Sequence, residues 1–180
     1  LYRRRQRQMC IRDRLITEIT SINKNCVVVL NTGSPVSMSW VKKPKAILQS
    51  WFGGQEYGNA LMEIIFGKTN PSGKLPTTFP IKIDDTPAYT SYPGQNSQMD
   101  YEEKLLIGYR WYEKKGIKPL FPFGHGLSYT NFNFENLKIE QKDENIYCRF
   151  NVSNVGKFDG KEIIQCYVAN ANCQNEEPIK

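Results

Sequence analysis

Histidine, closely spaced cysteines and long apolar runs are all scarce in this sequence of 180 residues. There is one histidine, and the five cysteines include no CxxC pair or other metal-type spacing, which argues against a metal centre. No stretch approaches the roughly 18 apolar residues that a membrane span needs. The charged start has no apolar segment behind it, so we expect no secretory signal. The sequence therefore predicts no metal, no other cofactor and no membrane partner.

The five cysteines are better interpreted as structural thiols. Cys148 and Cys166 occupy apolar positions of strand-like runs, which predicts that both are buried. The others are Cys10, Cys26 and Cys173. An odd number of cysteines without a pairing pattern favours a reducing or indifferent compartment, so a cytoplasmic location is slightly preferred to secretion.

Positive charge is concentrated at the start of the chain. The formal net charge is +6, but residues 1–14 contain six arginines and one aspartate, so the rest of the chain is close to neutral. The body of the protein therefore lacks the basic footprint of a nucleic-acid partner. Residues 1–14 are either a basic arm or, as we prefer, a segment foreign to the fold. Their like charges and missing apolar pattern predict disorder.

The pattern between residues 15 and 118 predicts an open α/β sheet. Apolar residues at helical spacing indicate a short helix over residues 13–24. The runs CVVVL and KAILQ are apolar on both faces, as in buried parallel strands. The segment GNALMEIIFG carries a helical apolar face that ends at Gly67. The stretch from 102 to 117 fits a short strand or a short helix equally.

After residue 131 the apolar period changes to two. The runs FNFENLKIEQ, NIYCRFNVSN and KEIIQCYVAN predict three strands with one face inward and one outward, as in a β-sandwich. A seven-stranded sandwich takes about 100 residues, so residues 131–180 predict an all-β domain that is cut short.

The lone histidine lies in PLFPFGHGLSYTNF, which is too aromatic for a solvated loop and too rich in proline and glycine for a helix or strand. His125 could be a general base, but we prefer a structural turn in which it hydrogen-bonds its own loop. GKTNPSGKL is not a phosphate loop, because five residues separate its glycines and leucine stands where serine or threonine would hold magnesium. NTGSPVS is no nucleophile elbow, because GxSxG fits in no register.

Glu56 is the candidate substrate-binding residue. It follows a glycine turn at the carboxyl end of a predicted strand, where open α/β sheets bind their ligands. The alternative is a buried glutamate that accepts hydrogen bonds from loop N–H groups. Asp84, Asp85, Glu102 and Glu103 stand in polar contexts and are expected to be solvated surface.

Four segments, in order, resemble one family. They are VVVLNTGSPVSMSW, QSWFGGQEYGNALMEIIFGKTNPSGKLPTTFP, LLIGYRWYEKKGIKPLFPFGHGLSYTNF and NVSNVGKFDGKEIIQCYV. They are similar to the C-terminal half of glycoside hydrolase family 3, and most of all to its bacterial β-glucosidases, over roughly residues 15–180. The resemblance implies that residues 15–118 are the later part of an α/β sandwich domain and that 119–130 are an aromatic joint. Residues 131–180 would then begin a fibronectin type III-like domain, and residues 1–14 lie outside the family pattern.

The resemblance also implies a function. Family members hydrolyse β-glycosides with retention and without a cofactor, using a nucleophile and an acid/base carboxylate about 5–5.5 Å apart. The nucleophilic aspartate belongs to a barrel domain that this chain lacks. The acid/base glutamate belongs to a GExxDR motif; if Asp13 and Arg14 ended that motif, Cys10 would replace the glutamate, and the spacing to Val27 is too short. Neither catalytic residue is therefore expected here.

The full-length protein would act on an oligo- or aryl-β-glycoside, and this chain by itself would be inactive. A non-catalytic sugar-binding or adhesion module is the alternative, and the sequence leaves the oligomeric state open. Gly53 and Tyr57 depart from the family turn PGQEGG, where proline and glycine are usual, so the shape of this loop is also left open.

Overall fold

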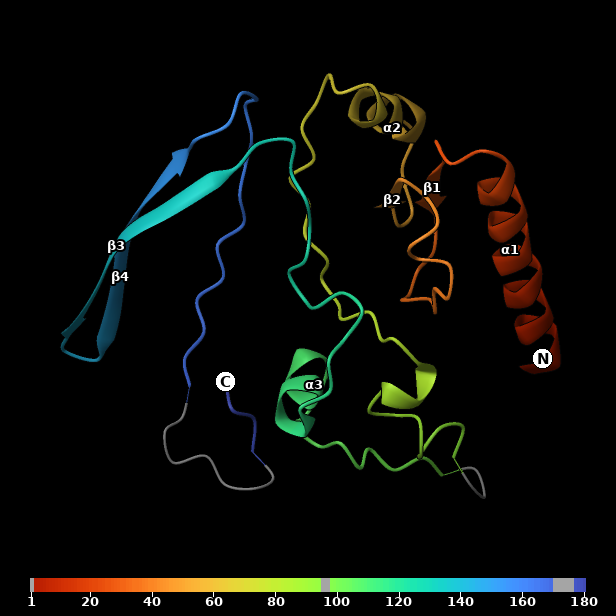
Figure 1. Ribbon diagram of the computed structural model, residues 1–180. Helices are drawn as coiled ribbons and strands as arrows, with labels where there is room; N and C mark the ends of the chain where they lie inside the picture. Colours follow the sequence, from red (N-terminus) through yellow and green to blue (C-terminus); the bar gives the residue numbers. More distant parts are fainter. Residues whose placement is uncertain (1, 95–97, 170–176) are drawn as a thin grey trace. The chain divides into compact units, whose positions relative to one another are not determined.

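The computed structural model describes residues 2–94, 98–169 and 177–180. Helices and strands are mixed along the chain, which divides into two compact units (Figure 1). The first unit comprises Leu1–Tyr57, Thr77–Phe123 and Val168–Lys180, and the second comprises Gly58–Pro76 and Gly124–Tyr167.

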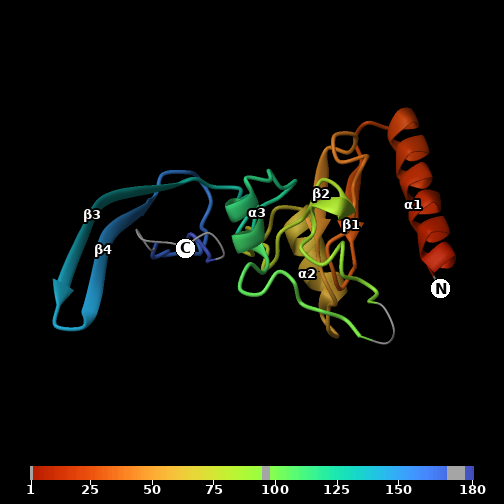
Figure 2. The same ribbon diagram turned by 90° about the horizontal axis from the view of Figure 1, so that it is seen from below.

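The first helix, α1, spans Tyr2–Ile22 (Figures 1 and 2). It is held by polar contacts from its C-terminal half. Asp13 Oδ1 accepts a hydrogen bond from Trp40 Nε1 at 2.8 Å, and Lys43 Nζ donates to Thr17 Oγ1 at 2.9 Å. These bonds fix the helix to the loop that contains Trp40 and Lys43.

The helix begins earlier than the sequence predicts. We expected a helix from residue 13 and disorder over residues 1–14, but α1 is helical from Tyr2 onward. Arginine, glutamine, leucine and methionine all have high helix propensity, and a helix that is already nucleated extends at little cost. A docked C-terminal half can therefore propagate through the arginine-rich segment.

The two predicted strands of the first unit pair in parallel, as expected. Strand β1 (Val27–Leu30) aligns Val27 with Ala46 of β2 (Ala46–Gln49), and the bond from Ser50 N–H to Leu30 O continues the ladder at 2.9 Å. Both strands are half-buried, not fully buried. The core of this unit is largely aromatic and consists of Met38, Trp40, Phe79, Leu106 and Tyr112.

Two short helices complete the first unit. The 3-10 helix η1 spans Ile83–Asp85, and α3 spans Tyr109–Lys115, which resolves the ambiguous stretch as a helix. α3 ends at Gly116, whose φ of 65° is left-handed and suits glycine at a helix C-terminus. Burial, followed by the charge of Asp85, raises the pKa of Tyr112 on this helix.

The second unit contains most of α2 and one hairpin. α2 spans Tyr57–Ile65 and ends before Gly67, which has a φ of 71°, as the sequence predicts. β3 (Phe132–Lys142) and β4 (Asn145–Asn154) form an antiparallel hairpin with one irregularity between Glu135 and Lys138 (Figure 2).

Two expectations for this part of the chain are wrong. Residues 161–169 form no strand, because a strand needs a hydrogen-bonded neighbour and none pairs with them among the described residues; residue 170 lies outside those. Cys148 and Cys166 are exposed, because no second layer covers them in the described structure. Cys26 is half-buried, and Cys173 lies outside the described residues.

Candidate functional site

The loops that follow β1 and β2 meet, because the two strands are parallel and end at the same edge. The Gln49 amide at the end of β2 donates to Thr32 O at 3.2 Å and to Thr32 Oγ1 at 3.3 Å, which ties the first loop to the second strand. Gln49 Oε1 is buried and has no donor among the described residues. The sequence predicts a ligand site at this edge, where β1 and β2 end.

An aromatic side chain of the second loop lies over the first. A Cβ atom on Gly33 would come within 2.7 Å of the Phe52 ring, so glycine is what lets the ring approach the NTGS loop. The Phe52 side chain is nevertheless 77% exposed. It is therefore supported from one side by Gly33 and accessible from the other.

Trp51 holds the start of this loop in a strained conformation. Its φ is 52°, in the left-handed region that non-glycine residues rarely adopt. Its ring packs on Phe79 of the core, with 6.4 Å between the ring centroids. The core contact therefore compensates a strained backbone of the kind that is concentrated at functional sites.

The end of the loop is tied back to its start. Ser50 Oγ and the Tyr57 hydroxyl are 2.9 Å apart, and Ser50 Oγ also donates to Leu30 O at 2.9 Å. Glu56 immediately precedes Tyr57 and is exposed, so the alternative of a buried glutamate is wrong. The loop presents Phe52 and Glu56 to solvent from a fixed base.

The histidine segment makes a different, structural site in the second unit. Leu75 bonds to this segment in both directions: its N–H donates to His125 O and its carbonyl accepts from Gly124 N–H, both at 2.8 Å. Lys74 Nζ donates to Gly126 O at 2.8 Å and forms an ion pair with Glu162 at 2.9 Å. The backbone of His125 is therefore paired with Leu75, while a hydrogen bond from its side chain to its own loop stays a prediction.

Burial and the Lys74 charge determine the titration of this cluster. Burial lowers the pKa of His125, and the nearby Lys74 lowers it further. Burial by itself would raise the pKa of Glu162, but hydrogen bonds from Lys74 and from Ile163 N–H, with the charge of Lys74, bring it below its ordinary value. A neutral histidine, an ammonium and a carboxylate are thus stabilised together.

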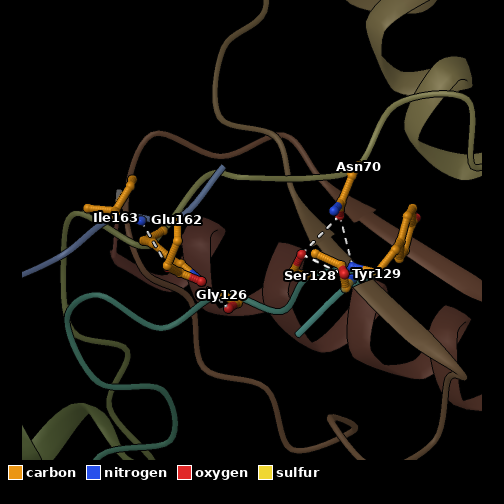
Figure 3. Close-up of polar contacts among 8 residues, drawn as sticks. Asn70, Gly126, Ser128, Tyr129, Glu162 and Ile163 are labelled. Carbon is orange, nitrogen blue, oxygen red and sulfur yellow. Dashed lines mark hydrogen bonds and ion pairs between the residues drawn. The ribbon is translucent and has the colours of Figure 1, made fainter. Parts of the chain in front are cut away.

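Asn70, from the segment GKTNPSGKL, is the centre of a second set of bonds in this unit. Asn70 Oδ1 accepts from Tyr129 N–H at 2.8 Å and from Ser128 Oγ at 3.1 Å (Figure 3). Its amide donates to Asp159 O at 3.0 Å. The Tyr129 hydroxyl donates to Ile64 O at 2.8 Å. The segment that superficially resembles a phosphate loop therefore anchors the chain before and after the hairpin.

The family of this chain follows from its match to a known domain family. The model of the glycosyl hydrolase family 3 C-terminal domain matches residues 7–129. This chain belongs to glycoside hydrolase family 3. The match begins at residue 7, eight residues earlier than the resemblance of the motifs indicates.

Curated relatives of this family 3 chain include β-glucosidases. It is 46% identical over 172 residues to thermostable beta-glucosidase B of Acetivibrio thermocellus, and 41% identical over 177 residues to probable beta-glucosidase I of Aspergillus flavus. These alignments cover 93% of the chain but only 23% and 21% of the relatives. The chain therefore spans less than a quarter of the length of these curated relatives.

Solved structures agree with the sequence relatives. The beta-glucosidase of Kluyveromyces marxianus matches with a TM-score of 0.88 and 36% identity, over 93% of this chain and 20% of that one. Beta-glucosidase 3B of Thermotoga neapolitana, solved in complex with glycerol, matches with a TM-score of 0.75 and 37% identity, over 81% and 22%. The mixed helix and sheet fold is thus that of family 3 β-glucosidases.

Three aromatic residues of the family 3 segment around His125 are half-buried or exposed, and each packs on another ring. In the first unit Phe121 packs on Phe79 with 6.3 Å between ring centroids, and Phe123 packs on Tyr109 with 5.2 Å. Both are half-buried. Tyr129 is 43% exposed, and its ring contacts Phe158 at 6.5 Å in the second unit.

The sequence reasoning also missed one buried carboxylate in this family 3 chain. Glu103 was expected on the solvated surface but is 8% exposed, and its Oε2 has no donor among the described residues. Glu103 O accepts a hydrogen bond from the N–H of the buried Leu106 at 2.8 Å, so both residues belong to one turn, which the local sequence pattern did not mark. Glu102 and Asp84 are exposed as expected, while Asp85 is half-buried and accepts from Lys82 N–H at 3.0 Å.

No group of three or more metal-ligating side chains occurs among the described residues of the chain. Within the same residues, no helix has the length and apolar character to cross a membrane.

Proposed function

We propose that the complete protein is a retaining β-glucosidase that acts on oligo- or aryl-β-glucosides, without a cofactor and without nucleic-acid or membrane partners. The observation that carries the proposal is the 46% identity to thermostable beta-glucosidase B across 93% of the chain. The complexes of beta-glucosidase 3B of Thermotoga neapolitana with glycerol and with alpha-D-glucose support a sugar as the ligand.

This chain supplies no catalytic carboxylate in the proposal. Retaining hydrolysis needs two opposed carboxyl groups about 5–5.5 Å apart. Asp13, which could be aligned with the acid/base motif, instead accepts hydrogen bonds from Trp40 and Ser39. The nucleophile and the acid/base are therefore assigned to parts of the protein outside these residues.

The loop after β2 is the part of this chain that we assign to the substrate. Its support is the position of Glu56 and Phe52 at the carboxyl end of a parallel strand, both exposed on a loop whose base is fixed. A carboxylate accepts hydrogen bonds from sugar hydroxyls, and an aromatic ring packs on the apolar face of a sugar. Glu56 is thus a proposed substrate-binding residue and not a catalytic one.

Residues 131–180 are proposed as the first half of a fibronectin type III-like domain. The antiparallel pairing of β3 and β4 supports this. So do the apolar side chains that alternate along them and stay in solvent, such as Phe134 at 50% and Ile139 at 65% exposure. A second sheet would cover these side chains and would give the residues after Glu162 a neighbouring strand.

The test is the activity of the full-length protein on nitrophenyl β-D-glucoside. We expect nitrophenol release, with β-glucose as the first anomer seen by proton NMR before mutarotation. The 180-residue chain should be at least about 10⁶-fold slower, because it lacks both carboxylates. α-Glucose as the first product would contradict retention, and sugar binding without turnover would favour a non-catalytic module. Turnover by the repurified chain would refute the assignment of the catalytic residues.

A further inference from the structure

The loop from Ser50 to Tyr57 differs from the usual family turn at two positions, and these two positions touch. Glycine stands at 53 and tyrosine at 57, at the positions where the resemblance to family 3 implies proline and glycine. A Cβ atom on Gly53 would lie 2.5 Å from the Tyr57 Cβ and closer still to its ring, a separation that real Cβ atoms essentially never have. The tyrosine ring therefore occupies the space that a side chain at position 53 would need.

The Tyr57 side chain cannot move aside without breaking bonds. Its hydroxyl lies 2.9 Å from Ser50 Oγ, and the Ser50 side chain and N–H both bond to Leu30 O at 2.9 Å. Its own N–H donates to Gly54 O at 3.2 Å where α2 begins. Both ends of the tyrosine are thus anchored while its ring covers Gly53.

We infer that Gly53 and Tyr57 are a coupled pair of positioning residues that fixes the path of this loop in place of the usual proline and glycine. Gly53 with Tyr57, and proline at 53 with glycine at 57, are two ways to fill the same space. Gly53→Pro alone would therefore overfill this space, and Tyr57→Gly alone would leave part of it empty, so each single substitution is unfavourable. The pair holds Phe52 and Glu56 in place, and its effect on substrate binding rests on the proposed function.

Hydrogen exchange of the Ser50 amide in the full-length protein tests the coupling. We expect Gly53→Pro and Tyr57→Gly each to speed this exchange by about tenfold or more, and the double variant to return to within about threefold of the wild type. Gly54→Ala is the matched control, since a Cβ atom there meets nothing within 4 Å, and its exchange should stay at the wild-type rate. A double variant that exchanges fastest of all would overturn the inference.

Two further measurements keep the inference falsifiable. If Gly53→Pro does not fold, Tyr57→Phe removes only the hydroxyl and should speed Ser50 exchange by about threefold; unchanged exchange would overturn the anchoring role.

The second measurement is kinetic. Gly53→Ala should raise KM for an aryl β-glucoside by about threefold or more with kcat within about twofold. Adding Tyr57→Gly to Gly53→Ala should bring KM back toward the wild-type value. Equal losses in kcat and kcat/KM would refute a positioning role in binding. If the wild-type protein hydrolyses no glycoside, the proposed function fails, but the exchange rates still decide the coupling.

Discussion

The two units are stabilised by different kinds of contact. Phe79 in the first unit is 1% exposed, whereas Phe134 in the second is 50% exposed. The buried apolar residues of the described structure all belong to the first unit. In the second unit, polar bonds from Asn70 and Lys74 connect segments that are far apart in sequence.

An alternating apolar pattern does not by itself predict burial. Alternation along β3 and β4 predicts which side chains share a face, but only a covering layer makes that face a core. Without the layer, the second unit depends on bonds such as the ion pair between Lys74 and Glu162, whose side chains are 12% and 16% exposed. Removing an aromatic ring should therefore destabilise the first unit more than the second, whereas removing a polar contact should destabilise the second unit.

The largest expected difference lies between two phenylalanines. Phe79→Ala should destabilise the chain by about 3–5 kcal/mol, because it leaves a cavity beside Trp51 and Phe121. Phe134→Ala should cost less than about 1 kcal/mol, because its ring is already half in solvent. Urea unfolding followed by far-UV circular dichroism measures both, and equal losses would contradict the contrast between the units.

The next prediction concerns two ion pairs. Lys74→Met should cost about 2–3 kcal/mol, since in a mostly buried place it leaves Gly126 O without this donor and the Glu162 carboxylate without its cation, with only the bond from Ile163 N–H remaining. The exposed pair Arg14–Glu18, with side chains 78% and 63% exposed, is the matched control and should contribute less than about 0.5 kcal/mol. Double-mutant cycles on both pairs give the two coupling energies, and a larger value for Arg14–Glu18 would refute this ranking.

Local patterns in the sequence predicted most of the helices and strands, but they did not predict the contacts between residues that are far apart in the chain. The runs around Val28 and Ile47 and the helix before Gly67 follow from hydrophobic period and a glycine stop, which are short-range signals. The Lys74–Glu162 pair joins residues 88 positions apart, and nothing local marks either of them. Glu56 was placed at the correct end of β2, but its exposure depends on how Tyr57 folds back to Ser50. That contact is set by tertiary structure and not by the pattern.

The titration of the second unit gives a smaller, pH-dependent effect. Burial and Lys74 hold the pKa of His125 below its ordinary 6.5 in the folded state, so the unfolded chain takes up this proton first. Stability should therefore fall as the pH drops below about 6.5. The lowered pKa of Glu162 adds a second loss, which begins below the ordinary value of 4.5 and grows as the pH falls through the folded pKa.

Two variants separate these pH windows. His125→Gln should flatten the fall in stability that sets in below about pH 6.5, and Glu162→Gln should flatten the further fall that sets in below about pH 4.5. Chemical unfolding at a series of pH values measures both. Stability of the wild type that rises as the pH falls from 7 to 5 would contradict the sign derived for His125.

The smallest effect is expected at the N-terminal end of α1. The family match begins at residue 7, and the polar contacts of the described helix side chains begin at Asp13, so we predict that residues 1–6 add little to stability. Arg3 and Arg7 stand one helical turn apart, where like charges are mildly unfavourable. Deleting residues 1–6 should therefore change the free energy of unfolding by less than about 0.5 kcal/mol, whereas Asp13→Ala, which breaks the bond to Trp40, should cost about 1 kcal/mol. Limited trypsin digestion should cleave within the first seven residues before any other site. Protection of these arginines, or a deletion that costs more than Asp13→Ala, would give the arginine-rich end a structural role.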